Sequence, residues 1–258
     1  MGQAQRNLRL LVAYDGTDFF GWQRQPNRPT IQGLLEQSLK VILDEEVVLH
    51  GSGRTDAGAH AAGQVANFLT SRRIPCSNLQ EALNNALPFS VRIRRVDEMA
   101  ADFHARYSAR SKTYRYRISQ QAVCSPFVAR YAHHYPYPLD VERMDRAARL
   151  LEGTHDFTSF AAAGDMDEDE APKQGSAVRQ ISQSRVTLKE RLQLVVYSVQ
   201  GSGFLRHMVR NIVGTLIEVG RGNLAPEEMA RILSARNRSL AGPTAPARGL
   251  CLMKVVYD

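Results

Sequence analysis

The sequence predicts an α+β protein of two ferredoxin-like-derived α/β domains, each with helices on a mainly antiparallel sheet. Its 258 residues suit one large domain or two ordinary ones, and 43% of them are hydrophobic, enough for a buried core. Short strand-like apolar runs are interleaved with segments in which apolar residues recur at helical spacing. Up to about residue 100 these segments follow the order β-α-β-β-α-β, which is typical of a ferredoxin-like domain.

The first strand is expected over Leu8–Tyr14, where β-rich apolar residues end at a turn. A helix follows over Ile31–Leu43, with Thr30 as its N-cap. Three further strands are expected in this half, over Val47–Leu49, Gln64–Leu69 and Val91–Val96.

The second helix has an apolar stripe that starts at Leu79. Ser77 precedes it, with Gln80 three residues later, and this spacing predicts a capping box. The helix is therefore expected to begin at Ser77.

The second half of the chain has a weaker pattern. Strands are expected over Thr113–Ile118, Ser184–Val199 and Leu250–Tyr257. Helices are expected after Asp140, over Leu205–Ile217 and after Pro226. We predict domains at 1–105 and 106–258, with a variable acidic loop over 161–177 in the second.

Charge favours a nucleic-acid partner. The net charge is +7, and 28 of the 33 cations are arginine, whose planar guanidinium binds phosphate through two hydrogen bonds. Genomic base composition is an alternative source of arginine. The acidic run Asp165–Glu170 opposes the trend and is expected to be a solvated loop.

The sequence contains no apolar run of the roughly 18 residues that a membrane span needs, and no apolar leader segment. A cytoplasmic protein without a membrane partner is expected. Cys76, Cys124 and Cys251 lie far apart, so no Cys-x-x-Cys metal knuckle is possible.

The densest polar segment is His50–His60, which contains three glycines. It lacks the Gly-Lys-Ser/Thr ending of a phosphate-binding loop, the glycine spacing of a dinucleotide site and the order of a metal site, so no metal is expected. If the segment is extended, Arg54 and Asp56 point to the same side. A nearby cation would keep Asp56 ionised as a nucleophile or general base. On these grounds a structural turn capped by Asp56 is the alternative, and it stays open.

This segment also belongs to a series of motifs that resembles the TruA family of tRNA pseudouridine synthases. The motifs occur in family order from residue 14 to residue 252. They are Tyr14–Thr17, Gly21–Gln23, Gln32–Gly33, Leu35–Glu36, Gly53–Gly58 with His60, Phe103–Arg106, Lys112–Tyr116, Asp156–Phe160, Met208–Gly214 and Ala247–Leu252.

The resemblance implies the pseudouridine synthase fold and the conversion of uridine to pseudouridine at positions 38, 39 and 40 of the tRNA anticodon stem-loop. It implies that Asp56 is the nucleophile, attacking either the base or the ribose. Arg54 would help extrude the target nucleotide or hold its phosphate. Tyr114 would stack on the base, and Arg210 would pair with Asp56. Leu250 would line the uracil pocket.

The resemblance also implies a homodimer and a reaction without a cofactor. Arg106, Arg110 and Lys112, interleaved with tyrosines, are the best local candidates for RNA contacts. On the helix around Met208, residues Arg206, His207, Arg210 and Asn211 are expected to lie off the apolar stripe. The competing hypotheses are a non-catalytic RNA-binding protein of the same fold, a synthase acting at another RNA site, and a glycosylase.

Overall fold

The computed structural model describes residues 5–162 and 177–257. The chain divides into two compact units, Met1–Arg110 with Cys251–Asp258, and Ser111–Leu250. The prediction placed the division after residue 105 and left the C-terminal strand in the second domain. That the two units are separate folding domains stays a prediction. The acidic run Asp165–Glu170 lies outside the described residues.

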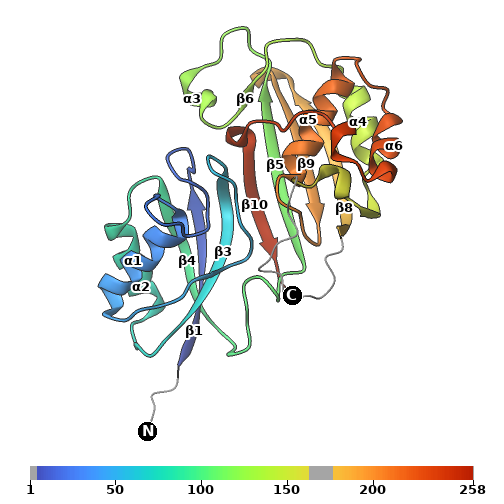
Figure 1. Cartoon of the computed structure of the whole chain (residues 1–258). Coiled ribbons are helices and arrows are strands. Elements are labelled where there is room, and N and C mark those ends of the chain that lie inside the picture. Colours follow the sequence, from blue (N-terminus) through green and yellow to red (C-terminus); the bar gives the residue numbers. More distant parts are fainter. Residues whose placement is uncertain (1–4, 163–176, 258) are drawn as a thin grey trace. The chain divides into compact units, whose positions relative to one another are not determined.

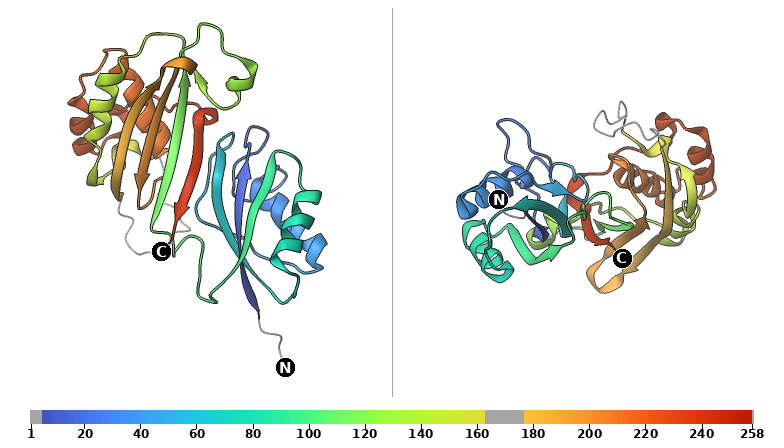
Figure 2. Two further views of the ribbon diagram at one scale, coloured as in Figure 1. Left: turned by 180° about the vertical axis from the view of Figure 1, so that it is seen from behind. Right: turned by 90° about the horizontal axis from the view of Figure 1, so that it is seen from below.

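The first unit is a mixed, mostly antiparallel sheet with two helices on one face (Figures 1 and 2). Its elements are β1 (Arg6–Tyr14), α1 (Ile31–Leu43), β2 (His50–Gly51), β3 (His60–Thr70), α2 (Cys76–Ala86), β4 (Val91–Met99) and β10 (Leu250–Val256). β1 lies between β4 and β3 and is antiparallel to both. The other edge of β3 pairs with β2 in the antiparallel direction and with β10 in the parallel direction.

Alternating burial along β1 explains where the core of this unit lies. Leu8, Leu10 and Val12 are fully buried, and so are Leu35 and Leu39 of α1. Alternate residues of a strand share one face, and the i, i+4 spacing places the two leucines on one stripe of the helix. Burying each of these side chains contributes about 1.5–3 kcal/mol.

Two predicted helix starts had different outcomes. The Thr30 cap is confirmed, because its Oγ1 accepts a hydrogen bond from the Gly33 amide at 3.3 Å. The capping box at Ser77 is wrong. α2 begins at Cys76 with Pro75 as its N-cap residue. The Ser77 hydroxyl donates instead to the side chain of Asn78 at 3.1 Å.

The strand predicted over Val47–Leu49 is also wrong, since β2 comprises only His50–Gly51. The backbone of Leu49 bonds to side chains of α1. Its amide donates to Glu36 at 3.1 Å and its carbonyl accepts from Gln32 at 3.0 Å. The buried polar side chains of the helix thus replace the strand partner that the apolar pattern had suggested.

The second unit is also a mixed, mostly antiparallel sheet, and helices cover one face of it (Figure 1). The strand order is β5-β9-β8-β7, all antiparallel, and β6 joins β5 in parallel. Its elements are β5 (Ser111–Ser119), α3 (Pro126–Ala129), β6 (His133–His134), α4 (Val141–Arg149), β7 (Gly153–Asp156), β8 (Val178–Lys189), β9 (Leu194–Gly201), α5 (Met208–Gly220) and α6 (Glu228–Ala235). The described residues of this unit also form short 3-10 turns at Thr158–Phe160, Glu190–Leu192, Arg238–Leu240 and Ala247–Gly249.

The run Ser184–Val199, predicted as one strand, is a hairpin of β8 and β9. The chain reverses through Glu190–Leu192 and through Gln193, which adopts a positive φ of 48°. Glycine and asparagine are the residues that favour this conformation, and position 193 holds neither. The sequence therefore has no signal for the turn.

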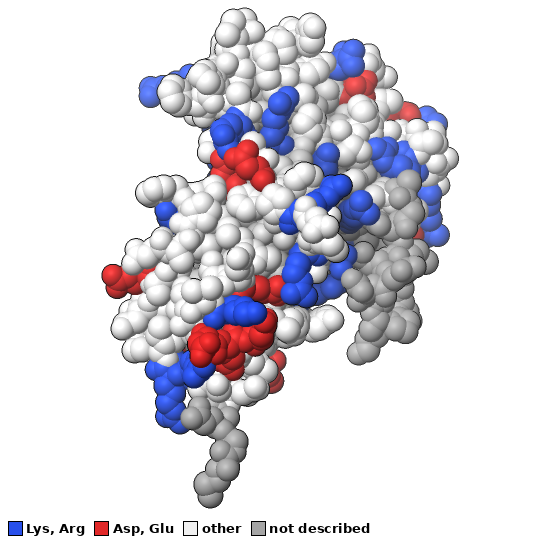
Figure 3. Space-filling view, turned by 60° about the vertical axis from the view of Figure 1, so that its left-hand side comes forward, with Lys and Arg blue, Asp and Glu red and all other residues white. Residues whose placement is uncertain are grey.

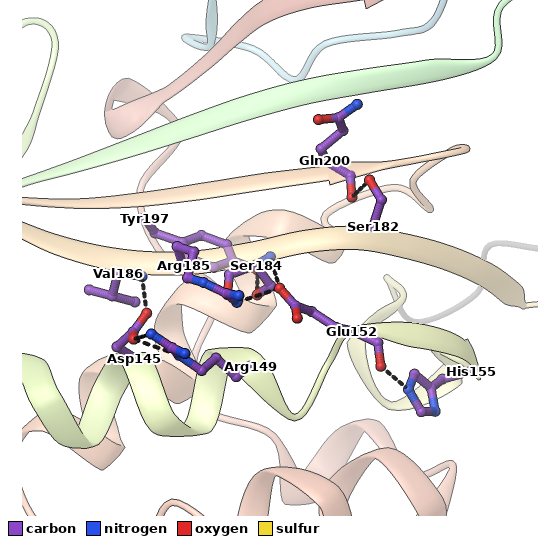
Figure 4. Close-up of polar contacts among 10 residues, drawn as sticks. All are labelled: Asp145, Arg149, Glu152, His155, Ser182, Ser184, Arg185, Val186, Tyr197 and Gln200. Atoms are coloured by element: carbon purple, nitrogen blue, oxygen red, sulfur yellow. Dashed lines mark hydrogen bonds and ion pairs between the residues drawn. The ribbon is translucent and has the colours of Figure 1, made fainter.

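Polar contacts bind α4 and the segment after it to β8 (Figure 4). Asp145 accepts from the Val186 amide at 2.9 Å and from Arg149 at 2.8 Å. Glu152 accepts from the Ser184 amide at 2.8 Å and pairs with the Arg185 guanidinium. α4 and the segment that follows it are therefore each held to β8 by one acidic side chain.

Candidate functional site

The Gly-rich segment forms a tight turn that presents Asp56. The Ala59 amide donates to the Asp56 carbonyl at 3.1 Å, and Gly58, at the third position of the turn, has a φ of 77°. This is the positive φ that a type II turn requires. Arg54 is exposed, Thr55 is buried and Asp56 is half-buried. The alternation fits an extended approach to the turn, with Arg54 and Asp56 on the side opposite Thr55.

A second loop, between β1 and α1, holds this turn by its backbone. The Trp22 amide donates to the Thr55 carbonyl at 3.1 Å, and the Gly58 amide donates to the Phe19 carbonyl at 3.2 Å. A β-carbon at Gly21, whose φ is 86°, would lie 2.5 Å from the Thr55 carbonyl oxygen. Glycine is therefore required here by conformation and by space.

A hydrogen bond between two buried hydroxyl groups fixes the position of Thr55. The Tyr14 hydroxyl and Thr55 Oγ1 are 2.8 Å apart, and both side chains are buried. Burial raises the pKa of Tyr14, so its hydroxyl keeps its proton. Because Thr55 lies between Arg54 and Asp56, this bond sets the position of both neighbours.

Both ends of the turn are anchored as well. At its start, Ser52 Oγ donates to Gln64 Oε1 at 2.6 Å, and Gln64 Nε2 donates to the Gly53 carbonyl at 2.9 Å. At its end, His60 Nδ1 accepts from the Gly16 amide at 3.1 Å and lies 3.2 Å from Asp15 Oδ1. The motifs around residues 14–23 and 53–60 are therefore parts of one structure in the first unit.

The second unit carries the other expected site residues. Tyr114 and Tyr116 share one face of β5 and are both buried. The Tyr116 hydroxyl donates to the Pro246 carbonyl at 2.7 Å, so this ring is a packing element. Tyr114 is 7% exposed and contacts the Phe204 ring edge-on at 5.0 Å between centroids.

Arg210 lies in the first turns of α5, next to the segment that leads to Leu250. Its Nε donates to the Ala245 carbonyl at 2.7 Å, and the Ala245 amide donates to the Arg210 carbonyl at 3.2 Å. Leu250 is buried at the start of β10. Pro246, whose carbonyl accepts from Tyr116, directly follows Ala245, whose carbonyl accepts from Arg210. Tyr116 and Arg210 therefore bind adjacent residues of the segment that leads to Leu250.

Asn211 does not lie off the apolar stripe as expected, because it is fully buried. Its Nδ2 donates to the Phe160 carbonyl at 2.8 Å, and its Oδ1 accepts from Thr244 Oγ1 at 2.7 Å and from Arg238 at 3.2 Å. The spacing of apolar residues gave no signal for this role, because it placed Asn211 off the stripe.

The expected RNA contacts are distributed over both units. Arg106 and Arg110 belong to the first unit and Lys112 to β5 of the second. Arg110 is exposed, and Arg106 and Lys112 are half-buried. On the face seen in Figure 3, Lys and Arg side chains occur in several groups with Asp and Glu between them.

The described residues contain neither a metal site nor a membrane-spanning helix. Residues 5–162 and 177–257 contain no group of three His, Cys, Asp or Glu side chains that could hold a metal ion. Over the same ranges no helix has the length and apolar character needed to cross a membrane.

Comparison with known proteins identifies the family. A family model described as tRNA pseudouridine synthase matches residues 10–108 and 147–258. The chain is 50% identical over 252 residues to tRNA pseudouridine synthase A of Solibacter usitatus, covering 98% of this chain and all of that protein. It is 46% identical to tRNA pseudouridine synthase A 1 of Desulfotalea psychrophila, with the same coverage.

A relative from Brevibacillus brevis, also a tRNA pseudouridine synthase A, is 46% identical over 253 residues, covering 98% of this chain and 100% of that protein. Among solved structures, a 3-hydroxy-3-methylglutaryl-coenzyme A reductase of Streptococcus pneumoniae aligns with 92% of this chain and 61% of its own, at 11% identity and a TM-score of 0.21, too low to indicate a common fold. The match to the family model and the near-complete coverage of these relatives show that the chain belongs to the tRNA pseudouridine synthase A family.

Proposed function

We propose that this chain isomerises uridine to pseudouridine at positions 38, 39 and 40 of the tRNA anticodon stem-loop, with Asp56 as the nucleophile. The observation that carries the proposal is the presentation of Asp56 on a turn whose backbone is held by a second loop. A nucleophile must be held within a fraction of an ångström of its productive position. A turn that merely reversed the chain would not need the buried Tyr14–Thr55 bond beneath it.

The reaction is an isomerisation, so substrate and product contain the same atoms. The glycosidic bond between N1 of uracil and C1′ of ribose breaks, the base turns, and C5 bonds to C1′. The proton on C5 leaves and N1 gains one, and no electrons are transferred to or from an external partner. Asp56 would form a covalent bond to the base or to C1′ in the course of these steps. The balance requires no cofactor.

The other site residues act on the same nucleotide. Arg54, exposed beside Asp56, would help draw the target nucleotide out of the stem or hold its phosphate. Tyr114 would stack on the extruded base, a contact worth about 1–3 kcal/mol. Arg210 would pair with the Asp56 carboxylate and keep it ionised. Leu250 would form an apolar wall of the uracil pocket.

Arg106, Arg110 and Lys112 would contact the RNA backbone. Such contacts give affinity that falls steeply with salt. Family membership supports three further parts of the proposal: a homodimer, a location in the cytoplasm together with the tRNA, and descent of both units from ferredoxin-like domains. The order β-α-β-β-α-β in the first unit agrees with the last.

The test is to map pseudouridine in anticodon-arm transcripts treated with wild-type enzyme. Product at positions 38 to 40 is expected, and product only elsewhere would refute the substrate assignment. The rival hypothesis of a non-catalytic RNA-binding protein predicts binding without product. A glycosylase would release free uracil, which chromatography detects.

A further inference from the structure

A column of aromatic rings lies on the first unit, apart from the catalytic turn. The rings of His50 and His104 are 5.0 Å apart between centroids, at 40° to each other. Those of His104 and Tyr107 are 4.4 Å apart, at 35°. The guanidinium of Arg106 lies 5.9 Å from the Tyr107 centroid. Tyr107 ends the column and is 75% exposed.

The backbone under this column is fixed. The Ser108 amide donates to the His104 carbonyl at 2.9 Å, and the His104 amide donates to Ser108 Oγ at 3.1 Å. The Ala105 amide donates to buried Asn67 at 2.8 Å, and the Tyr257 hydroxyl donates to the Ala105 carbonyl at 2.7 Å. A ligand of these rings would therefore bind to a preformed surface and order little of the chain.

The chemistry of the column suits a nucleobase. His104 Nδ1 accepts from the Arg106 amide at 3.1 Å, so the backbone holds this ring in place between those of His50 and Tyr107. Burial, with His50 and Arg106 nearby, lowers the pKa of His104, so its ring is neutral near pH 7. Aromatic rings beside an arginine are an arrangement on which proteins stack unpaired bases.

The position of the column excludes the reacting uridine as its ligand. His50 pairs with Asn67 of β3, whereas the turn of Asp56 joins β3 at His60. Those seven residues of extended strand span about 23 Å. A base on the column would therefore belong to a different nucleotide from the one that reacts at Asp56.

We propose that His50, His104 and Tyr107 form a platform on which a second, unpaired base of the substrate RNA stacks. The inference rests on the proposed function only in taking that RNA to be the tRNA anticodon arm. The platform would fix the register of the RNA while the target uridine is extruded elsewhere. These are positioning residues, since none of them reaches the reacting atoms.

The test measures binding of anticodon-arm RNA to full-length enzyme, together with kcat at saturating RNA. Tyr107→Ala should raise Kd about tenfold, leave kcat within about twofold and leave the slope of log Kd against log salt unchanged. Tyr107→Phe should bind like the wild type, and His104→Ala should also bind more weakly. Phe89→Ala is the matched control, because Phe89 is 96% exposed and has Arg92 over its ring at 4.6 Å. Its affinity should not change.

Wild-type affinity in Tyr107→Ala and His104→Ala, both confirmed as folded by thermal melting, would overturn the platform. So would a loss that disappears at high salt, because the contact would then be electrostatic. Failure of the wild type itself to bind the RNA would refute the substrate assignment and, with it, the platform. Binding by the wild type with unchanged variants would refute the platform alone.

Discussion

Gly21→Ala should uncouple the catalytic turn from the loop that holds it. The new β-carbon would lie 2.5 Å from the Thr55 carbonyl oxygen and 3.2 Å from the Ala57 amide nitrogen. Ordinary contact begins at 3.4 Å, so the turn must retreat by about 0.9 Å. A displacement of about 1 Å costs roughly 100-fold in rate. Backbone strain at the φ of 86° adds about 1–2 kcal/mol, and the clash about 1–3 kcal/mol.

The assay is a single-turnover rate of pseudouridine formation, paired with urea unfolding. Gly222→Ala is the matched control, since its φ is 84° but nothing lies within 4 Å of the new β-carbon. It should lose about 1–2 kcal/mol of unfolding free energy and keep its rate. If Gly21→Ala lost no more stability than Gly222→Ala and kept its rate within twofold, the turn would not be held as described.

Three further predictions concern the surroundings of the site. Asn211→Ala should lower the unfolding free energy in urea by about 3 kcal/mol, because the Phe160 carbonyl and two side-chain donors lose a buried partner; a loss below about 1 kcal/mol would contradict this. Arg210→Ala should remain folded by circular dichroism and lose about 10²–10³-fold in kcat/KM, as expected for loss of an electrostatic partner; unchanged activity would refute the pairing. Burial raises the pKa of Tyr14 and Tyr197 in the folded protein, so the unfolded chain alone ionises these groups as pH rises above about 10, and stability should fall there. Phenolate absorbance should show hydroxyls that ionise only on unfolding, and their titration in the folded state would contradict the burial.

Local signals predicted the elements whose partners are near in sequence. The spacing of Ile31 to Leu43 behind Thr30 gave α1 with its cap, because one face and one side-chain oxygen determine such a helix. The Ser77 box failed, because the helix already begins at Cys76 after Pro75. The same spacing of polar residues occurs inside a helix and at its start, so spacing alone does not choose between them.

Contacts between distant segments could not be predicted from one sequence. β10 pairs in parallel with β3, joining Cys251 to His60 across most of the chain, whereas the apolar pattern indicated only that a strand exists. The turn at Gln193 has no glycine to mark it. Tertiary packing determines both features.

The candidate site, too, could be predicted from the sequence only in part. Spacing placed Arg54 and Asp56 on one side of an extended segment, and the burial of Thr55 between them agrees. The bond from Tyr14 to Thr55 and the demand for glycine at position 21 depend on contact between two loops, which no periodicity encodes. The chemical roles of Asp56, Arg54, Tyr114 and Arg210 stay predictions.

Release of tritium from RNA that carries 5-tritiated uridine tests most directly whether the Asp56 carboxylate performs the isomerisation. C5 loses its hydrogen when it bonds to ribose, so each turnover releases one label. Wild-type enzyme and the control Asp44→Asn, which alters an exposed carboxylate of the same unit, should release tritium at equal rates. Asp56→Ala should bind the RNA and release none, whereas release at an appreciable fraction of the wild-type rate would contradict the assignment of the nucleophile.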